Sequence, residues 1–147
     1  MTKKLTIKVK RFDTTLPLPE RKSDGAACLD LSARVDVVIE PKSFGKIPLN
    51  VAVQVPKGHW VMLAARSSTH KLGLLPANGI GIGDEDFCGN DDEYQFLVYN
   101  PTEQPTTVEK GTRVAQMMVL PYEIPEIVEV DEMKSENRGG IGSTGTK

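Results

Sequence analysis

Residues 51–55 read Val-Ala-Val-Gln-Val and residues 5–10 read Leu-Thr-Ile-Lys-Val-Lys, so strongly apolar side chains recur at every second position. Successive side chains of a β-strand point to opposite faces of a sheet, and this period of two is therefore typical of half-buried strands. Further strand-like apolar or β-branched runs lie at residues 35–39, 60–63, 96–99, 114–120 and 127–130. Ten prolines punctuate the chain at intervals suited to short strands and tight connections. The pattern predicts an all-β domain, either a barrel or a sandwich.

One short helix is expected at residues 69–72, with Ser67 or Ser68 as its cap and a glycine at its end. The 147 residues contain no repeat and no linker, which fits one domain. The last residues are rich in glycine and nearly free of apolar side chains, so alone they would be disordered. The sequence therefore predicts a β domain over residues 1–132 and a flexible glycine-rich C-terminal tail over residues 133–147.

Composition excludes several classes of protein. The chain carries 18 basic and 20 acidic residues, a formal net charge of -2, without a sustained basic block, so it lacks the electrostatic footprint of a duplex-binding protein. No apolar run has the length of a signal peptide or reaches the ~20 residues that a membrane-spanning helix needs. Cys28 and Cys88 lack the paired spacing of a zinc site and are expected to be reduced thiols. We therefore expect a cytoplasmic protein without nucleic-acid or membrane partners.

Residues 78–89 read Asn-Gly-Ile-Gly-Ile-Gly-Asp-Glu-Asp-Phe-Cys-Gly and join a turn signal to glycines at every second position. Such glycines leave one face of a strand bare, so that a flat ligand can lie against the backbone. Asp84 follows this strand directly, where a carboxylate can hold and deprotonate a water molecule. The competing interpretation is a solvated acidic loop, which we favour for residues 91–93.

Residues 64–68 read Ala-Ala-Arg-Ser-Ser, at the end of one predicted strand and the start of the short helix. Free amides at a helix start, the Arg66 guanidinium and two hydroxyls suit a phosphate group, and this is compatible with simple capping by Ser67. Residues 111–116 read Gly-Thr-Arg-Val-Ala-Gln and lead into a buried strand. By themselves they are a weak signal, because Arg and Gln on a strand usually face solvent.

The tail combines glycines at positions 139, 140, 142 and 145 with Ser143 and Thr144, and Arg138 adds a positive charge. Glycine lets backbone N–H groups approach an anion closely, so this segment suits a phosphate chain. A frayed terminus is the alternative interpretation on composition alone.

Together these segments resemble the trimeric, all-β dUTP diphosphatases (dUTPases). Five family motifs occur in the family's order, at residues 26–31, 65–68, 78–89, 111–116 and 139–145. The resemblance implies a distorted β-barrel or jelly-roll with one short helix and a flexible C-terminal tail. It also implies Mg2+-dependent hydrolysis of dUTP to dUMP and pyrophosphate by a homotrimer. Neighbouring subunits would share each active site, with the tail closing over the nucleotide.

The resemblance also implies individual roles. Asp84 would activate the water that attacks the α-phosphorus, and Asp30 would assist Mg2+ through water. The residues expected to hold the phosphate chain are Arg66, Ser67, Ser68, Gln116, Arg138, Ser143 and Thr144. The residues expected to hold uracil and deoxyribose are Asn78, Gly81, Ile82, Gly83, Phe87 and Ile141.

Several positions depart from the family pattern. Phe87 stands where the family has a tyrosine and keeps a ring beneath the deoxyribose, so discrimination against ribose is expected to survive. Ile141 replaces a phenylalanine that stacks on uracil; such a stack is worth ~1–3 kcal/mol, so tail closure is expected to be weaker. The family's tail arginine falls by count on Glu136, so either a local slip brings Arg138 to the γ-phosphate or that contact is lost. Gly83 stands where a β-branched residue usually precedes the aspartate.

Two other functions are weighed against this one. The related dCTP deaminases also carry an Arg-Ser-Ser segment and use a glutamate after the hairpin, for which Glu93 is a poorly placed candidate. A weakly active, nucleotide-sensing dUTPase homologue that engages a protein partner is suggested by the changes at Ile141 and Glu136.

Overall fold

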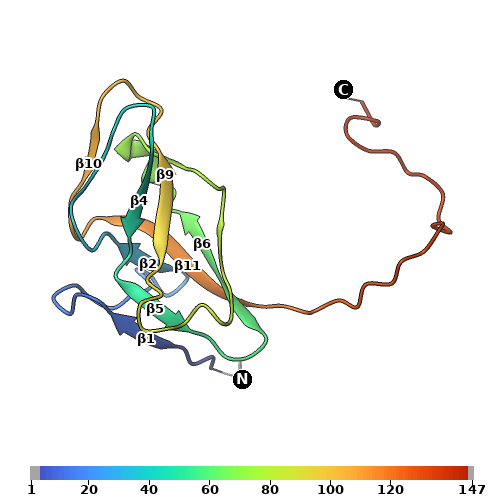
Figure 1. The fold of residues 1–147 in the computed structure, drawn as a ribbon, viewed down its shortest axis with the longest axis horizontal. Helices are drawn as coiled ribbons and strands as arrows, with labels where there is room; N and C mark the ends of the chain where they lie inside the picture. Colours follow the sequence, from blue (N-terminus) through green and yellow to red (C-terminus); the bar gives the residue numbers. More distant parts are fainter. Residues whose placement is uncertain (1–3, 146–147) are drawn as a thin grey trace.

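The computed structural model describes residues 4–145 as an all-β body from which the last part of the chain departs (Figure 1). The only helical element in this range is a single 3-10 turn, η1 (Thr69–Leu72), so the predicted all-β class with one short helix is confirmed. The strands are β1 (Lys8–Arg11), β2 (Leu29–Ser32), β3 (Val37–Ile39), β4 (Phe44–Pro48), β5 (Val51–Gln54), β6 (His59–Ala65), β7 (Leu75–Pro76), β8 (Gly81–Gly83), β9 (Gln95–Tyr99), β10 (Thr106–Val108) and β11 (Arg113–Pro121).

Within residues 4–145 the strands form sheets of order β1-β5, β10-β3, β4-β9-β7 and β2-β11-β6-β8. The last of these carries most of the segments singled out in the sequence. On β11, Gln116 lies opposite Asp30 of β2 on one side and Ala64 of β6 on the other. The glycine strand β8 pairs with the other edge of β6, with Gly83 opposite Val61. Four sequence-distant motifs are therefore held on four neighbouring antiparallel strands.

The core is mainly aliphatic, as a chain with only 5% aromatic residues requires. Along β9 the side chains alternate between half-buried and buried, which is the predicted period of two. Aromatic side chains enter the core at Tyr94 and Phe96, which are 4% and 3% exposed. Fully buried aliphatic side chains include Leu31, Ile39, Ile47, Val61, Val98, Val114 and Met117.

Most of the predicted strand runs are confirmed, in β1, β5, β6, β9 and β11, and the run at residues 35–39 shortens to β3. The strand expected at residues 127–130 is wrong, because no strand forms there and Ile127 and Val128 are 90% and 70% exposed. The apolar, β-branched run is present, but no strand among residues 4–145 pairs with it.

After β11 the chain leaves the body as an extended C-terminal arm, residues 122–145 (Figure 1). All of its residues are exposed, and the apolar side chains of Ile124 and Met133 are 83% and 84% exposed. The arm includes residues 122–132, which the sequence assigns to the β domain, so the boundary at residue 132 stays a prediction.

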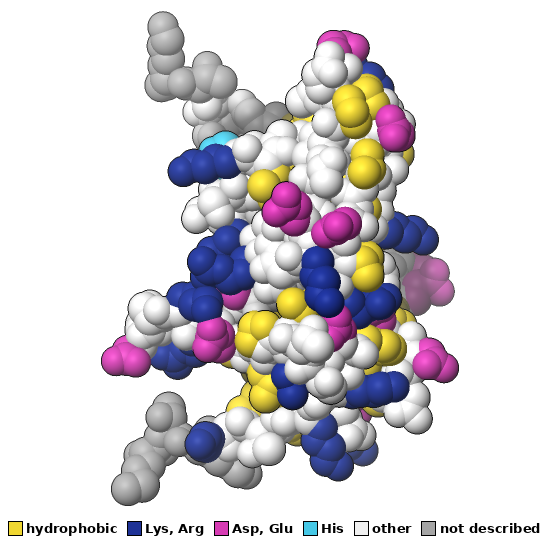
Figure 2. All heavy atoms as spheres, turned by 90° about the vertical axis from the view of Figure 1, so that its left-hand side faces the viewer, with side chains coloured by type: hydrophobic (Ala, Val, Ile, Leu, Met, Phe, Trp, Pro, Cys, Tyr) yellow, Lys and Arg dark blue, Asp and Glu magenta, His cyan; other side chains and the backbone are white. Residues whose placement is uncertain are grey.

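Charged side chains of both signs cover the surface of the body. Figure 2 shows Lys and Arg intermixed with Asp and Glu over the face that it draws, without a continuous field of one sign. Among the described residues, no helix is both long enough and apolar enough to pass through a membrane.

Candidate active site

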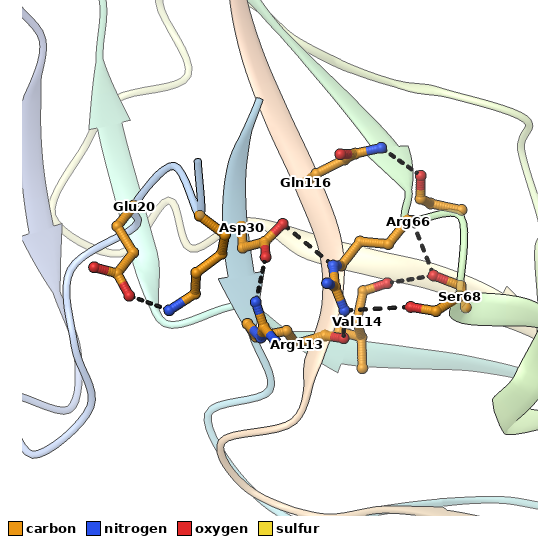
Figure 3. Close-up of polar contacts among 10 residues, drawn as sticks. Glu20, Asp30, Arg66, Ser68, Arg113, Val114 and Gln116 are labelled. Atoms are coloured by element: carbon orange, nitrogen blue, oxygen red, sulfur yellow. Dashed lines mark hydrogen bonds and ion pairs between the residues drawn. The ribbon is translucent and has the colours of Figure 1, made fainter. Parts of the chain in front are cut away.

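The first part of the candidate site is a charged group that we call the Asp30 cluster: Asp30, Arg66, Arg113 and Gln116 (Figure 3). Both arginines donate to the carboxylate of Asp30, from Arg66 Nε to Oδ1 at 3.2 Å and from Arg113 Nη1 to Oδ2 at 2.9 Å. The Asp30 side chain is only 13% exposed, so these ion pairs are less screened than pairs in open solvent. Two guanidinium groups on one carboxylate leave a net positive charge, which suits a phosphate group.

Arg66 is fixed at both its backbone and its side chain. Its backbone N–H donates to the Thr69 hydroxyl at 2.9 Å, and that buried hydroxyl donates in turn to the Val114 carbonyl at 2.9 Å. Its Nη1 donates to the Arg113 carbonyl at 3.1 Å. The guanidinium therefore has a defined place where β6 ends beside β11.

The turn after Arg66 differs from the expected helix start. Ser68 occupies the N-cap position but makes no side-chain cap hydrogen bond, and its hydroxyl lies 3.4 Å from Arg66 Nη1 instead. The element that follows is a 3-10 turn of 4 residues, too short to supply a useful helix dipole. The groups here that could bind a phosphate are therefore the guanidinium groups and the serine hydroxyls, and the expected roles of Ser67 and Ser68 stay predictions.

Gln116 and Arg113 complete the Asp30 cluster from β11. Gln116 Nε2 donates to the Ala65 carbonyl at 2.9 Å, which orients the side-chain amide. From the sequence alone, Arg113 is expected to face solvent, and its side chain is 41% exposed. Its ion pair with Asp30 depends on the pairing of β2 with β11, which no local sequence signal reveals.

The second part of the candidate site is the glycine hairpin, residues 78–89. Gly81 pairs with Leu63, and a Cβ on Gly81 would lie 3.1 Å from the Leu63 Cβ, so the missing side chain lets β8 approach β6 closely. Beside the strand is a cavity of about 240 Å³, whose walls include Asn78, Ile82 and Phe87. The glycine face itself packs on Leu63 and Tyr94, so a flat ligand would have to lie in the neighbouring cavity, and its binding there stays a prediction.

Asp84 ends this strand and is exposed. It faces a second hollow of about 650 Å³, whose other walls include Trp60 and Tyr122. The Asp84 carbonyl accepts a hydrogen bond from the Phe87 N–H at 3.1 Å, and this turn brings residue Phe87 close to Asp84. Phe87 is 39% exposed and stacks on Tyr94, with ring centroids 5.6 Å apart.

The neighbouring carboxylate, Glu85, has a different role. It accepts hydrogen bonds from the Gly58 N–H at 2.6 Å and from the Tyr122 hydroxyl at 2.8 Å. These two bonds, the first being the stronger cause, lower the pKa of Glu85 below its ordinary value. Glu85 thus joins the hairpin to the first residue of the arm, whereas Asp84 is left facing the hollow.

The two parts of the site are separated within one chain. Gly83 lies opposite Val61, and Arg66 lies five residues further along the chain, or about 17 Å at the usual rise per strand residue. Asp84 continues beyond Gly83 in the opposite direction. A single chain therefore does not bring Asp84 and Arg66 to the same phosphorus atom.

The glycine-rich end of the arm lies away from both parts (Figure 1). Arg138, Ile141, Ser143 and Thr144 are all exposed and contribute to neither the Asp30 cluster nor the hairpin cavity. A local turn forms there, with the Ser143 N–H donating to the Gly140 carbonyl at 3.2 Å. The predicted tail contacts with a nucleotide stay predictions.

Magnesium fits this chain only as a weakly coordinated ion. Among the described residues, no group of three or more His, Cys, Asp or Glu side chains is placed to hold a metal. Asp30 has the hard oxygen donors that Mg2+ prefers, but both of its oxygens are paired with arginines, so an ion here would keep its waters and be held mostly by the phosphates of a ligand. These features suit an all-β protein that binds a phosphate-bearing ligand.

Comparison with known proteins is consistent with that class. Residues 14–146 match the family model described as dUTPase. The deoxyuridine 5'-triphosphate nucleotidohydrolase of Desulfitobacterium hafniense is 39% identical over 150 residues, covering 95% of this chain and 97% of that protein. The SPbeta prophage-derived deoxyuridine 5'-triphosphate nucleotidohydrolase of Bacillus subtilis is 35% identical over 146 residues, covering 97% and 100%. The chain belongs to the dUTPase family.

Solved structures agree on the fold. A dUTPase of Staphylococcus bacteriophage 80alpha, solved as a G164S mutant with dUpNHpp, superposes with a TM-score of 0.84 at 24% identity, covering 96% of this chain and 99% of that one. The dUTPase of Streptococcus mutans gives a TM-score of 0.74 at 25% identity, covering 80% and 98%.

Proposed function

We propose that this protein is a dUTP diphosphatase, which hydrolyses dUTP to dUMP and pyrophosphate with Mg2+. Family membership and the activity named for its relatives support the substrate. The main structural support is the position of Asp84, which follows the glycine strand and faces a hollow that shares Ile82 with the cavity lined by Asn78 and Phe87. In the proposal, uracil occupies that cavity and the α-phosphorus lies within reach of water held by Asp84.

In the proposed reaction the Asp84 carboxylate accepts a proton from a water molecule. The water oxygen bonds to the α-phosphorus, the bond from that phosphorus to the bridging oxygen breaks, and pyrophosphate leaves. Asn78 and the backbone of Gly81, Ile82 and Gly83 hold the uracil edge, where a 5-methyl group or a cytosine amino group finds no partner. The Phe87 ring lies under the deoxyribose.

The phosphate chain is assigned to the Asp30 cluster. Arg66 and Gln116, with the hydroxyls of Ser67 and Ser68, hold phosphate oxygens, and Arg113 adds charge beside them. When bound, Mg2+ would supply positive charge beside the triphosphate, and Asp30 would help to hold the ion through water. Preorganised charge of this kind is the main contribution that a protein makes to phosphoryl transfer.

The active form is proposed to be a homotrimer with shared sites. Asp84 and Arg66 of one chain are about 17 Å or more apart, so the two residues serve one nucleotide only if they come from different chains. The exposed apolar side chains of the arm are suited to burial against another copy. The arm would then bring Arg138, Ile141, Ser143 and Thr144 over the bound nucleotide.

The dCTP deaminase alternative is disfavoured by the environment of Glu93. Arg34 donates two hydrogen bonds to its carboxylate, at 2.7 and 3.0 Å, and the Asn50 N–H donates a third at 2.9 Å. With the side chain only 9% exposed, this carboxylate is engaged in holding the fold together. Glu93 is therefore a poor candidate for deaminase chemistry.

A nucleotide-sensing homologue is the second candidate. It rests on Ile141 and Glu136, which replace an aromatic ring and an arginine of the family pattern. It also fits the similarity to a Staphylococcus phage dUTPase, at 25% identity and a TM-score of 0.83, that is described as controlling the transfer of virulence genes. Slow turnover combined with tight dUTP binding would favour it.

A cytoplasmic location is part of the proposal. Cys28 and Cys88 are both free thiols, which suits a reducing compartment. Burial, followed by the charge of Asp30, raises the pKa of the Cys28 thiol, so it stays protonated and unreactive at neutral pH.

Pyrophosphate release from dUTP, dCTP, dTTP and UTP, with and without Mg2+, tests the proposed function. We expect Mg2+-dependent release from dUTP to be much faster than from the other three nucleotides, and Asp84→Asn to lower kcat by at least about 100-fold, the usual contribution of a general base. Asp91→Asn, in the exposed acidic loop, is the matched control and should keep wild-type turnover. Normal turnover by Asp84→Asn, or no release from dUTP, contradicts the proposal.

A further inference from the structure

Tyr94 contains the one buried side-chain polar atom without a hydrogen-bond partner among residues 4–145, its hydroxyl oxygen. The residue is only 4% exposed, so the unpaired hydroxyl lies in the core. Burying a hydroxyl without a partner costs free energy, and a phenylalanine would avoid that cost. The position of the hydroxyl therefore calls for a structural reason.

That reason lies directly beneath β8. A Cβ built on Gly83 would collide with the Tyr94 hydroxyl and lie 2.9 Å from its ring Cζ atom. The hydroxyl thus occupies the space that a side chain at position 83 would fill, immediately before Asp84. Gly83 and Tyr94 are complementary: the missing side chain of one makes room for the long side chain of the other.

The ring of Tyr94 has a second contact. It stacks on Phe87 with the two planes 13° apart and the centroids 5.6 Å apart. Tyr94 itself is held by its backbone, whose N–H donates to the Val51 carbonyl and whose carbonyl accepts from the Leu49 N–H, both at 2.9 Å. One firmly held side chain therefore touches both the strand that ends at Asp84 and the ring assigned to the sugar.

The hydroxyl also keeps its proton. Burial, followed by the nearby Cys88 and Asp84, raises the pKa of Tyr94 to about 12. The phenol is therefore neutral around pH 7, and its contact with β8 does not depend on pH in that range.

We propose that Tyr94 is a positioning residue of this active site, whose hydroxyl sets the place of Gly83 and Asp84 and whose ring sets the plane of Phe87. The inference rests on the proposed function, since it takes Asp84 as the base and Phe87 as the floor of the sugar site. The proposal assigns a separate effect to each part of the side chain. Loss of the hydroxyl should lower kcat, and loss of the ring should lower the preference for deoxyribose over ribose.

Two substitutions separate these effects. Tyr94→Phe removes only the hydroxyl and should lower kcat for dUTP by about threefold to tenfold with KM unchanged, because the catalytic carboxylate loses its fixed place. Tyr94→Leu also removes the ring and should lower the ratio of kcat/KM for dUTP to that for UTP by about fivefold, the usual worth of an aromatic pair.

A rescue experiment tests the complementarity of positions 83 and 94. Gly83→Ala alone forces a collision with Tyr94 and should lower kcat by at least about tenfold. Combining it with Tyr94→Leu removes the nearest obstacle and leaves the Val61 Cβ at 3.0 Å, so the double variant should recover part of the loss, with a kcat above that of Gly83→Ala and below that of Tyr94→Leu. If the double variant is no better than Gly83→Ala, the proposal is wrong.

Phe96→Leu is the matched control. Phe96 is 3% exposed, lies two residues along the same core face, and loses the same kind of ring. Thermal unfolding of both leucine variants measures the general cost of losing a buried ring. Equal losses of dUTP-over-UTP preference in Phe96→Leu and Tyr94→Leu would mean that Tyr94 acts only on stability, which overturns the proposal.

Binding of imido analogues of dUTP and UTP separates this inference from the proposed mechanism, because it requires no turnover. We expect wild type and Asp84→Asn to prefer the deoxyribose analogue, and Tyr94→Leu to lose about fivefold of that preference. An unchanged preference in Tyr94→Leu overturns the assignment of Tyr94. Full activity of Asp84→Asn would instead overturn the assigned base, while a loss of preference in Tyr94→Leu would still support the sugar role.

Discussion

The two ends of β6 show two ways of building half of an active site. At one end Arg66 is held by hydrogen bonds and by its ion pair with Asp30, so its position is fixed by polar contacts. At the other end β8 lies close to β6 because Gly81 and Gly83 have no side chains, and Tyr94 packs underneath. A site for phosphate needs charged groups in fixed positions, whereas a site for uracil needs backbone that the ring can approach. One such candidate site lies at each end of β6.

The same comparison supports the proposal that two chains share each site. Along β6, Asp84 and Arg66 of one chain are about 17 Å or more apart. In the proposed trimer, each chain would therefore contribute to two different sites. Changes in the Asp30 cluster should weaken phosphate binding strongly, and changes around the hairpin other than at Asp84 should have smaller effects.

The largest of the three effects is a loss of kcat/KM, and it is expected in the Asp30 cluster. Arg66→Gln removes a guanidinium that a phosphate requires and unpairs one oxygen of the 13% exposed Asp30 carboxylate. We expect kcat/KM for dUTP to fall by about 100-fold or more, because charge-assisted contacts to phosphate are lost. Steady-state kinetics with Mg2+ measures this. Arg21→Gln, at an exposed arginine outside the cluster, is the control; a loss below threefold in Arg66→Gln would show that the cluster does not bind phosphate.

An effect of intermediate size, a gain in affinity for the nucleotide, is expected in the arm. Ile141→Phe supplies a ring that can stack on uracil, and stacking of this kind contributes ~1–3 kcal/mol, so binding of a dUTP analogue should tighten by about tenfold. Isothermal titration calorimetry measures the change. Ile141→Leu adds no ring and should bind like wild type. If the phenylalanine variant binds no tighter, residue 141 does not reach the base.

The smallest effect is on thermal stability, and it is expected at Glu85 within the glycine hairpin. Its pKa is lowered by the Gly58 N–H and then by Tyr122, so its contribution to stability is present above the ordinary glutamate pKa and is lost as the pH falls through the lowered value. Glu85→Gln should therefore lower Tm slightly at pH 7, with the difference from wild type vanishing in acid. Thermal unfolding as a function of pH measures it, and a difference that grows in acid would contradict the assigned sign.

The sequence predicts the parts of this molecule that depend on local pattern. The period of two at residues 51–55 becomes β5, and the glycine spacing before Asp84 becomes the bare strand β8. A local pattern misleads at residues 127–130, where an apolar, β-branched run is present but no strand among the described residues pairs with it. Such a run indicates that a segment can form a strand, and it does not say where the partner is.

The missing parts depend on contacts between distant residues. Arg113 reaches Asp30 only because β11 pairs with β2, a contact across 83 positions of sequence. Tyr94 has no motif around it, and its contact with Gly83 depends on how a core side chain runs under β8. Such packing follows from the assembled fold, so a single sequence does not reveal it.

Mixing two inactive variants tests the central claim, that Asp84 and Arg66 of different chains serve one nucleotide. Asp84→Asn and Arg66→Gln chains are unfolded together, refolded at equal amounts and assayed for pyrophosphate release from dUTP. Random assembly should restore about a quarter of wild-type turnover per site, because a quarter of the sites then combine an intact Asp84 with an intact Arg66. Recovery no greater than the sum of the two variants assayed alone would contradict the claim.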